Sequence, residues 1–168
     1  MAMTESLQKV DHTALKVNQL TIILLNLAAF ILVLPWLTLL VALVMLLGTL
    51  LKRPGFGFVY SGLLKPLGWV KPEVLMDNPQ PHRFAQGFGG VVMLAGAIAL
   101  FGGVSGLGWG LVWLVTALAG VNVFGGFCVG CFVYYWLSRL GVPGFDRHPP
   151  LGTFPGMKPK GARLNDDH

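Results

Sequence analysis

Long apolar runs dominate the chain, and polar residues gather in the segments between them. The first run covers residues 17–51 and is interrupted only by isolated polar residues and by Pro35. A second run begins at residue 84 and continues, across a short Ser105-Gly106 interruption, to about residue 140. Apolar runs of this length are typical of membrane-spanning helices rather than of the core of a water-soluble protein.

The length of each run indicates how many times the chain crosses a membrane. One crossing takes about 20 residues, so residues 17–51 are too many for one helix and barely enough for two. Pro35-Trp36 lies near the middle of this run, and we expect a turn there because proline ends helices and Trp favours the membrane interface. The second run divides into residues 84–104 and 107–127. The pattern predicts an all-α polytopic membrane protein with four transmembrane helices in two hairpins.

The polar segments complete the predicted organisation. The portion between the two runs is too interrupted by Pro and Gly to span, and we expect it to lie in the membrane interface. The C-terminal portion is rich in Pro and Gly, which is typical of a flexible tail. The predicted regions are an N-terminal segment (1–16), a first hairpin (17–51), an interfacial loop (52–83), a second hairpin (84–140) and a tail (141–168).

Residues 127–140 form an apolar stretch at the end of the second hairpin. A separate crossing by this stretch would move the basic tail to the other side of the membrane. We therefore expect it to extend the fourth helix or to form a re-entrant segment at the cytoplasmic face.

Composition agrees with a membrane protein. Hydrophobic residues make up 54% of the chain and charged residues only 11%, whereas a soluble domain carries about 25% charged residues. The net charge is +5, but the basic residues flank the apolar runs. We interpret them as determinants of topology and as contacts for membrane lipids, and we expect no nucleic-acid partner.

The positions of the basic residues favour one topology. All twelve Lys and Arg residues fall within residues 1–16, 52–83 and 139–168, and none lies near either predicted turn. Lys- and Arg-rich loops remain in the cytoplasm. Four crossings place all three basic segments on that side, whereas a single kinked helix over residues 17–51 would send the middle segment outside. We expect both termini to be cytoplasmic.

A short internal repeat precedes each apolar run. Asp11-His12 followed by Lys16-Val17-Asn18-Gln19 leads into the first run, and Asp77-Asn78 followed by Arg83-Phe84-Ala85-Gln86 leads into the second. Both segments place an acid, a spacer, a base and a Gln in the same order, 67 residues apart from Lys16 to Arg83. This order indicates a parallel repeat of a two-helix unit.

The strongest local signal for chemistry is the segment Gly125-Gly126-Phe127-Cys128-Val129-Gly130-Cys131, which holds both cysteines of the chain. Residues three apart share one face of a helix, and such a pair can form a disulfide and reopen by thiol exchange. The two glycines would let a helix break and restart with Cys128 at its N-terminus, where the helix dipole lowers the pKa of a thiol. We predict Cys128 as the nucleophile and Cys131 as the resolving thiol.

Two other interpretations of the cysteines remain open. Cysteine packs well as a small apolar residue, and the Gly126 and Gly130 spacing allows close contact between helices. A metal site is the weaker alternative, because zinc prefers four ligands and only His12, His82, His148 and His168 could add to two thiolates. A Cu(I) site would need fewer ligands. We predict no metal, and the sequence identifies no cofactor.

Several polar residues are expected at the same depth as the cysteines, at the cytoplasmic ends of the helices. Polar groups within a membrane domain are costly and are candidates for function. Arg83 could stabilise a thiolate or an anionic sulfur substrate, or it could be an interfacial anchor. The amides could bind substrate or could join helices. The candidate substrate-binding residues are Arg83, Gln86, Gln19, Asn18 and Asn122.

Three motifs occur in a fixed order along the chain: Asp11 to Gln19, Pro81-His82-Arg83-Phe84-Ala85-Gln86, and Gly126 to Cys131. Together they resemble the motifs of the bacterial DUF4395 membrane proteins over about residues 10–137. A Glu often follows the second cysteine in that family. Phe132 stands there in this chain, so a role for that acid does not carry over. The resemblance implies the bacterial cytoplasmic (inner) membrane and an association with thioredoxin-like or rhodanese-like proteins, hence thiol redox chemistry or sulfur handling.

Three functional hypotheses follow from the sequence. The first is a membrane component for thiol–disulfide redox chemistry or sulfur handling that uses the cysteine pair at the cytoplasmic end of the last helix. The second is a non-enzymatic subunit or scaffold of a larger membrane complex, with structural cysteines. The third is a transporter of a small sulfur species that uses the pair as a transient binding site.

Overall fold

A computed structural model of the chain describes residues 8–145 and 152–159. The N-terminal residues 1–7, and the parts of the predicted tail at 146–151 and 160–168, lie outside the described residues. The elements in chain order are β1 (Gln8–Asp11), α1 (His12–Ile31), α2 (Pro35–Leu50), α3 (Gly57–Val59), the π-helix η1 (Tyr60–Leu64), β2 (Val74–Asp77), α4 (Pro79–Phe101), α5 (Ser105–Gly125) and α6 (Val129–Arg139).

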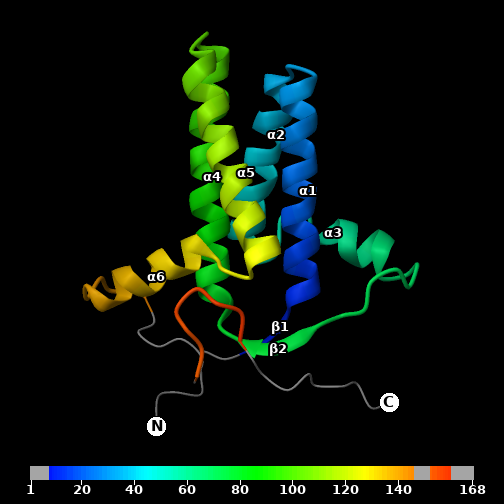
Figure 1. The fold of residues 1–168 in the computed structure, drawn as a ribbon, viewed down its shortest axis with the longest axis vertical. Coiled ribbons are helices and arrows are strands. Elements are labelled where there is room, and N and C mark those ends of the chain that lie inside the picture. Colours follow the sequence, from blue (N-terminus) through cyan, green and yellow to red (C-terminus); the bar gives the residue numbers. More distant parts are fainter. Residues whose placement is uncertain (1–7, 146–151, 160–168) are drawn as a thin grey trace.

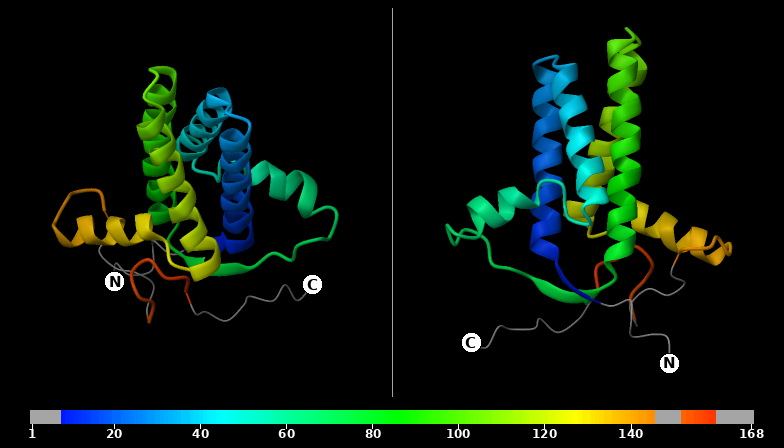
Figure 2. Two further views of the ribbon diagram at one scale, coloured as in Figure 1. Left: turned by 45° about the horizontal axis from the view of Figure 1, so that its top comes forward. Right: turned by 180° about the vertical axis from the view of Figure 1, so that it is seen from behind.

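The long helices α1, α2, α4 and α5 stand side by side and form the body of the molecule (Figure 1). Helix α4 packs against α2 and α5, and α1 packs against α5 and α2. The α3–η1 segment and α6 project outward near one end of this bundle, and the two short strands close that same end (Figure 2). The buried core between the helices consists of Ile22, Val41, Ala42, Met45, Phe56, Met93, Val112 and Val115.

Three of the helices have the length and apolar composition of membrane spans. These are α1, with 20 residues, α4, with 23, and α5, with 21. Helix α2 has 16 residues, which at 1.5 Å per residue gives about 24 Å against a hydrocarbon core of about 30 Å. The predominantly helical membrane character is therefore confirmed, whereas a fourth crossing would depend on this shorter helix.

The two repeat units begin in the same way. Asp11 caps α1, since its carboxylate accepts the backbone N–H groups of Thr13 and Ala14 at 2.9 and 3.4 Å. Asn78 caps α4 by accepting the N–H of Gln80 at 3.0 Å. Each cap satisfies N–H groups that have no partner inside the helix. Helix α4 begins 67 residues after α1, which is the spacing of the sequence repeat.

The two strands join the starts of the repeat units. Strands β1 and β2 pair antiparallel, and Lys9 lies opposite Met76. These two residues are also 67 positions apart, so the strands pair symmetrically about equivalent residues. The sequence analysis did not predict this sheet, because each strand has only four residues and its partner is remote in the chain.

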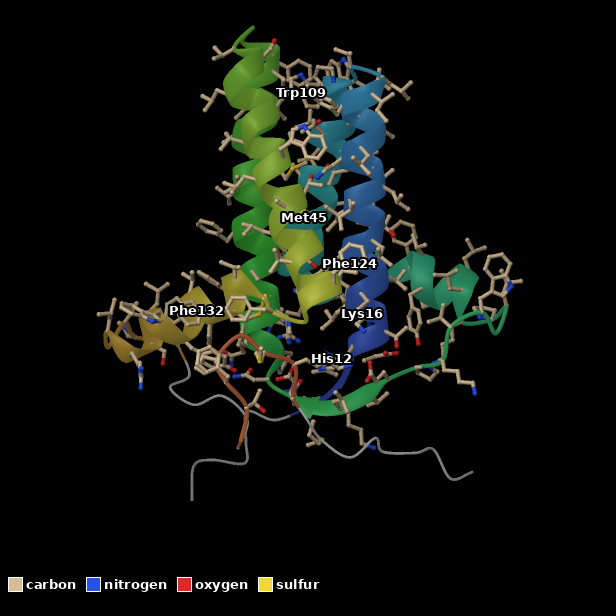
Figure 3. The ribbon with its side chains drawn as sticks, viewed as in Figure 1. His12, Lys16, Met45, Trp109, Phe124 and Phe132 are labelled. Carbon is tan, nitrogen blue, oxygen red and sulfur yellow. A yellow bond between two sulfur atoms is a disulfide. The ribbon has the colours of Figure 1, made fainter. Side chains whose placement is uncertain are left out.

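The two ends of the bundle differ in character. The segments that carry the Lys and Arg residues of the described chain all lie at the end with the sheet. Figure 3 shows His12 and Lys16 at this end and Trp109 near the other. At the far end, the rings of Trp36 and Phe101 are in contact, 4.7 Å apart. The charge asymmetry on which the topology prediction rests is thus present in the fold.

Residues 127–140 do not extend the last long helix of the bundle. Gly126 ends α5 in the left-handed conformation, with φ of 64°, and α6 then leaves the bundle in a different direction (Figure 1). The second hairpin as predicted, residues 84–140, therefore contains three helices. The break lies at the paired glycines, where the backbone can adopt this φ without a steric penalty.

Candidate functional site

The two cysteines lie at the break between α5 and α6 and form a disulfide, with their α-carbons 5.2 Å apart. Cys128 is the N-cap of α6, and its sulfur accepts the backbone N–H of Cys131 at 3.2 Å. The sequence-based prediction of a restarted helix with Cys128 at its N-terminus is confirmed. An N–H donor and the helix dipole would both stabilise a thiolate at Cys128 after reduction.

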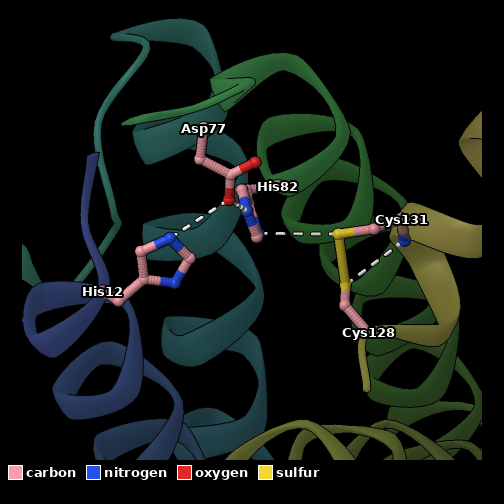
Figure 4. Close-up of a disulfide and its surroundings, with 5 residues drawn as sticks. All are labelled: His12, Asp77, His82, Cys128 and Cys131. Atoms are coloured by element: carbon pink, nitrogen blue, oxygen red, sulfur yellow. Dashed lines mark hydrogen bonds and ion pairs between the residues drawn. A yellow bond between two sulfur atoms is a disulfide. The ribbon is translucent and has the colours of Figure 1, made fainter. Parts of the chain in front are cut away.

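His82, in the first turns of α4, lies against the other sulfur. Its Nδ1 is 3.5 Å from the Sγ of Cys131, and its Nε2 is 2.9 Å from the Oδ2 of Asp77 (Figure 4). Because the carboxylate faces Nε2, the neutral ring carries its proton there. Nδ1 then points its lone pair at Cys131 and could accept a proton from the reduced thiol.

Asp77 connects His82 to a second histidine. The Nε2 of His12, the first residue of α1, lies 3.1 Å from the same Oδ2 of Asp77, and the two imidazole rings meet edge to face (Figure 4). Burial would raise the pKa of Asp77, but hydrogen bonds and charge from His12 and His82 lower it to about 2. Asp77 is thus a buried carboxylate that orients His82 through a hydrogen bond and lies within ion-pair distance of His12.

Residues 154–158 of the tail cross over the cysteine turn. The carbonyl of Gly156 accepts the backbone N–H of Cys128 at 2.8 Å, and the N–H of Lys158 reaches the carbonyl of Gly126 at 3.3 Å. Lys158 also forms an ion pair with Glu73. The tail was predicted to be flexible as a whole, but this portion has a path defined by contacts with the cysteine turn.

A polar pocket opens beside the disulfide on the side of the sheet and the tail. Cys128 and Cys131 both line it, together with residues from α1, β2, α4 and the tail. Its polar members include His12, Lys16, Gln19, Asp77, Asn78, His82, Asn122 and Lys158. We call this the polar pocket.

A second pocket extends from the disulfide into the helix bundle. Cys128 lines it but Cys131 does not. Most of its other residues are apolar side chains of the long helices, among them Ile22, Met45, Val92, Leu114, Val115 and Leu118. We call this the apolar pocket. Leu15, Gln19, His82, Asn122 and Cys128 line both pockets, so they mark the junction between them.

Asn18 and Gln86, two of the predicted substrate-binding residues, are engaged in structural hydrogen bonds. Asn18 accepts the N–H of Phe56 at 2.7 Å and donates to Gln86 at 3.4 Å. Gln86 in turn accepts from the N–H of Gly55 and donates to the carbonyl of Met45 at 3.0 Å. These bonds hold the turn after α2 against α1 and α4, which is the helix-joining role that the sequence also allowed.

Gln19 and Asn122 differ from this pair. Both line the junction of the two pockets. Among the described residues, neither side chain has a hydrogen-bond partner. Two amides without a partner among the described residues therefore lie at the junction of the two pockets, which Cys128 also lines.

Arg83 does not lie with the cysteines, contrary to the prediction. It lines a different pocket with Lys9, Lys52 and Arg53, and it lines neither of the two pockets that contain Cys128. Successive residues of a helix point about 100° apart. Because His82 faces the disulfide, its neighbour Arg83 cannot. His82 occupies the position that the sequence analysis assigned to Arg83.

The cluster includes two sets of three potential metal ligands. His82, Cys128 and Cys131 form one set, and His12, Asp77 and His82 form the other, each with its ligand atoms within 4.8 Å of one another. In the reduced state the first set could hold a soft cation, and Asp77 would orient the histidine from behind. The sequence-based prediction of no metal rests on the preference of zinc for four ligands, and it does not foresee that His82 lies beside the cysteines.

The sequence singles out His12 and His82 only as possible metal ligands, and it does not identify Asp77 as a member of the site. A signal was present, because Asp77 and His82 belong to the second repeat motif and His12 to the first. The sequence did not show that the two motifs meet through the sheet. Phe132, at the position where the similar family often has Glu, faces the tail instead, and its ring stacks on Phe154 with centroids 6.4 Å apart.

Comparison with known proteins gives one match. A family model described as a domain of unknown function, DUF4395, matches residues 10–139. This range contains the four long helices, strand β2, the second half of β1 and the cysteine pair. No curated protein and no solved structure matches the chain.

Proposed function

The chain belongs to the DUF4395 family, a domain of unknown function, and from this premise we propose that it is a membrane thiol–disulfide exchange protein whose reactive group is the Cys128–Cys131 pair. The observation that carries the proposal is the contact of 3.5 Å between the Sγ of Cys131 and the Nδ1 of His82. Asp77 orients that imidazole from its other nitrogen. A disulfide with purely structural importance needs no oriented base at one of its sulfurs.

The exchange begins with a reduced dithiol in the polar pocket. Its first thiol gives its proton to Nδ1 of His82 and attacks the Sγ of Cys128. The protein disulfide breaks, and Cys131 leaves as a thiolate that faces the imidazolium of His82. His82 returns the proton to the Cys131 thiolate and then accepts the proton of the second thiol of the dithiol. The sulfur of that second thiol attacks the dithiol sulfur of the mixed disulfide, and Cys128 leaves as a thiolate that takes up the proton. The dithiol becomes a disulfide, and the two cysteines hold its two electrons.

The choice of Cys128 as the attacked sulfur follows from accessibility. Both cysteines are buried, with 6% of Cys128 and 3% of Cys131 exposed. Cys128 lines both pockets and Cys131 only one. Attack at Cys128 also makes Cys131 the leaving group, next to the base that stabilises its thiolate.

The cellular location of the cysteine pair and the number of membrane crossings are also part of the proposal. We place the cysteine pair at the cytoplasmic face of a bacterial inner membrane, with four crossings that include α2, because the basic segments gather at that end of the bundle. The reduced partner is then a thioredoxin-like or rhodanese-like protein or a small thiol in the cytoplasm. The polar pocket, bordered by Lys16 and Lys158, suits such a water-soluble partner.

The test measures how fast dithiothreitol reduces the disulfide of the purified protein in nanodiscs at pH 7. A thiol-reactive mass tag detects the cysteines that have been reduced. His82→Gln is expected to slow the reduction roughly 10²-fold, because general acid–base help is lost. In Cys131→Ser, the remaining Cys128 is expected to form a stable mixed disulfide with glutathione after incubation with glutathione disulfide. Cys128→Ser is expected to form far less, because Cys131 lies deeper.

Arg83→Gln is the matched control, since Arg83 is the next residue on the same helix but lines another pocket. It should be reduced at the wild-type rate. Equal rates for His82→Gln and the wild type would contradict the proposal. So would a wild-type disulfide that resists dithiothreitol until detergent unfolds the protein.

A scaffold role is the second candidate, and one observation favours it. Helix α6 lies so close to α4 that a Cβ at Gly130 would be 2.5 Å from the Cβ of Ala85, so the cysteine turn also helps to pack the helices. The two roles differ in the double variant Cys128→Ala/Cys131→Ala. A scaffold predicts normal assembly and cellular function, whereas the exchange protein predicts normal assembly with loss of function.

A further inference from the structure

We propose that the apolar pocket binds a membrane quinone, which takes the two electrons that the cysteine pair collects. This inference rests on the proposed thiol–disulfide function and names its electron acceptor. The chain has only two cysteines, so no second dithiol of its own can receive the electrons. A two-electron acceptor must therefore come to Cys128 from outside the chain.

Cys128 is reached from two sides of different character. The polar pocket approaches it from the sheet and the tail, and the apolar pocket approaches it from within the helix bundle. A water-soluble thiol and a membrane-soluble acceptor can thus reach the same sulfur by separate routes. This arrangement suits a protein that transfers electrons from an aqueous donor to an acceptor dissolved in the bilayer.

The apolar pocket is open to the outer surface of the bundle. Phe88 on α4 and Leu114 on α5 line it and are also 56% and 50% exposed. Both belong to helices that are long and apolar enough to cross a membrane. In a membrane these side chains would face acyl chains, so a ligand dissolved in the bilayer can enter laterally between them.

The junction of the two pockets matches the polar groups of a quinone. Gln19 and Asn122 present amides that, among the described residues, have no other hydrogen-bond partner. A quinone ring carries two carbonyl oxygens that accept hydrogen bonds, and the remainder of the molecule is apolar. A free amide in a largely apolar site favours a ligand with such acceptors over an acyl chain, which has none.

The reaction balances with quinone as the only oxidant. The reduced pair loses two protons and two electrons, the S–S bond forms between Cys128 and Cys131, and the quinone becomes a quinol with two O–H groups. His82, which lines both pockets, takes the proton of Cys131 at Nδ1 and can pass it on to the quinol oxygen. The pair is then ready for the next thiol.

The experiment uses the reduced wild-type protein in nanodiscs under anaerobic conditions, with decylubiquinone as the probe. Loss of quinone absorbance and closure of the disulfide are expected together, one quinone per protein. The rate of disulfide closure by diamide is measured in parallel, because this small water-soluble oxidant does not need to bind in the apolar pocket. The quantity compared between variants is the ratio of the quinone rate to the diamide rate, which corrects for general loss of structure.

Leu118→Trp introduces an indole into the apolar pocket and is expected to lower this ratio at least about tenfold by excluding the ring. Leu24→Trp is the matched control, since Leu24 lies on the outer face of α1 with 65% of its side chain exposed and outside both pockets. It should retain the wild-type ratio. Gln19→Leu/Asn122→Leu is expected to raise the quinone concentration needed for half-maximal rate.

The outcomes separate this inference from the proposed function. If dithiothreitol reduces the wild-type disulfide rapidly and diamide closes it but decylubiquinone does not, the quinone site is refuted and the exchange function stands. An unchanged ratio in Leu118→Trp would also refute the site, because oxidation would then bypass the pocket. If neither oxidant closes the pair and dithiothreitol does not open it, the exchange function itself fails.

Discussion

At the residue scale, Asp77 shows how the site depends on one buried carboxylate. Its Oδ2 meets the Nε2 atoms of both His12 and His82, and its side chain is almost fully buried. An ionised carboxylate in such a place is stable only with close hydrogen-bond donors. The position of the His82 imidazole beside Cys131 therefore depends on a residue that contacts neither sulfur.

Asp77→Asn is expected to destabilise the protein by about 1–3 kcal/mol, because His82 loses its charged hydrogen-bond acceptor and the buried His12 loses its charged neighbour. The pKa of Asp77, lowered to about 2 by the two histidines against burial, sets the pH dependence. The carboxylate contributes its full stabilisation above about pH 4, where it would be ionised in the unfolded chain too, and loses it as the pH falls toward 2. Thermal unfolding of both proteins between pH 2 and pH 6 measures the difference.

Glu73→Gln supplies the matched control for that series. The ion pair of Glu73 with Lys158 is partly exposed, and the hydrogen bond from Lys158 is the main cause of the lowered pKa of Glu73. Its removal should cost less than about 1 kcal/mol. If Asp77→Asn is as stable to thermal unfolding as Glu73→Gln at pH 6, the Asp77 carboxylate does not organise the site.

The candidate site was only partly predictable from individual residues. The cysteines are conspicuous because they are the only two and stand three apart after paired glycines. Gln19 and Gln86 look equivalent in the repeat, yet Gln19 lines both pockets, whereas Gln86 lines only the apolar pocket and holds the turn at Gly55. The sequence cannot separate them, because the difference lies in which backbone groups each amide meets in the folded chain.

At the scale of elements, the contact between α6 and α4 controls how close Cys131 lies to His82. The backbone of Gly130 approaches Ala85, and the hydroxyl of Tyr134 donates to Gln80 at 2.8 Å. Both contacts hold α6, which carries Cys131, against α4, which carries His82. Small displacements of α6 should therefore change chemistry as well as packing.

Gly130→Ala is expected to slow reduction of the disulfide by dithiothreitol, since the new methyl group would push α6 away from α4 and separate Cys131 from His82. The overpacking should also cost about 1–3 kcal/mol of stability. Gly125→Ala, whose added Cβ would meet only the Cγ1 of Val121 at 3.9 Å, provides the control. Equal reduction rates in the two variants would mean that the α6–α4 contact does not position the base.

Elements with a strong local signal were predicted and elements held by remote partners were not. The long helices follow from apolar runs, and the break before α6 follows from Gly125-Gly126. Helix α1 begins five residues before its apolar run, because Asp11 caps it there. The strands and the tail residues across Cys128 depend on partners far away in the chain, which local patterns do not reveal.

At the scale of the whole molecule, the bundle has a basic end, which holds the disulfide, and an apolar end with the two turns that follow α1 and α4 (Figure 1). Three helices have the length of membrane spans, and α2 is shorter. An odd number of crossings would separate the basic segments between the two sides of the membrane. The position of α2 therefore decides the topology.

Single cysteines in a Cys128→Ala/Cys131→Ala background can test this arrangement. In intact cells, a membrane-impermeant maleimide should label Val33→Cys and Ser105→Cys, which lie in or beside the turns at the apolar end. Ser61→Cys, which lies beyond α2, should be labelled only in inside-out vesicles. Labelling of Val33→Cys and Ser61→Cys from the same side would show that α2 does not cross.

The register of the small sheet bears on how the molecule arose. Lys9 pairs with Met76, its own equivalent one repeat later, and Asn26 meets its equivalent Met93 inside the bundle. Contacts between equivalent positions are what two identical half-length chains would make across the axis of a homodimer. The geometry is that of a duplicated and fused gene. Fusion lets the halves diverge, and only the second half carries the cysteine pair.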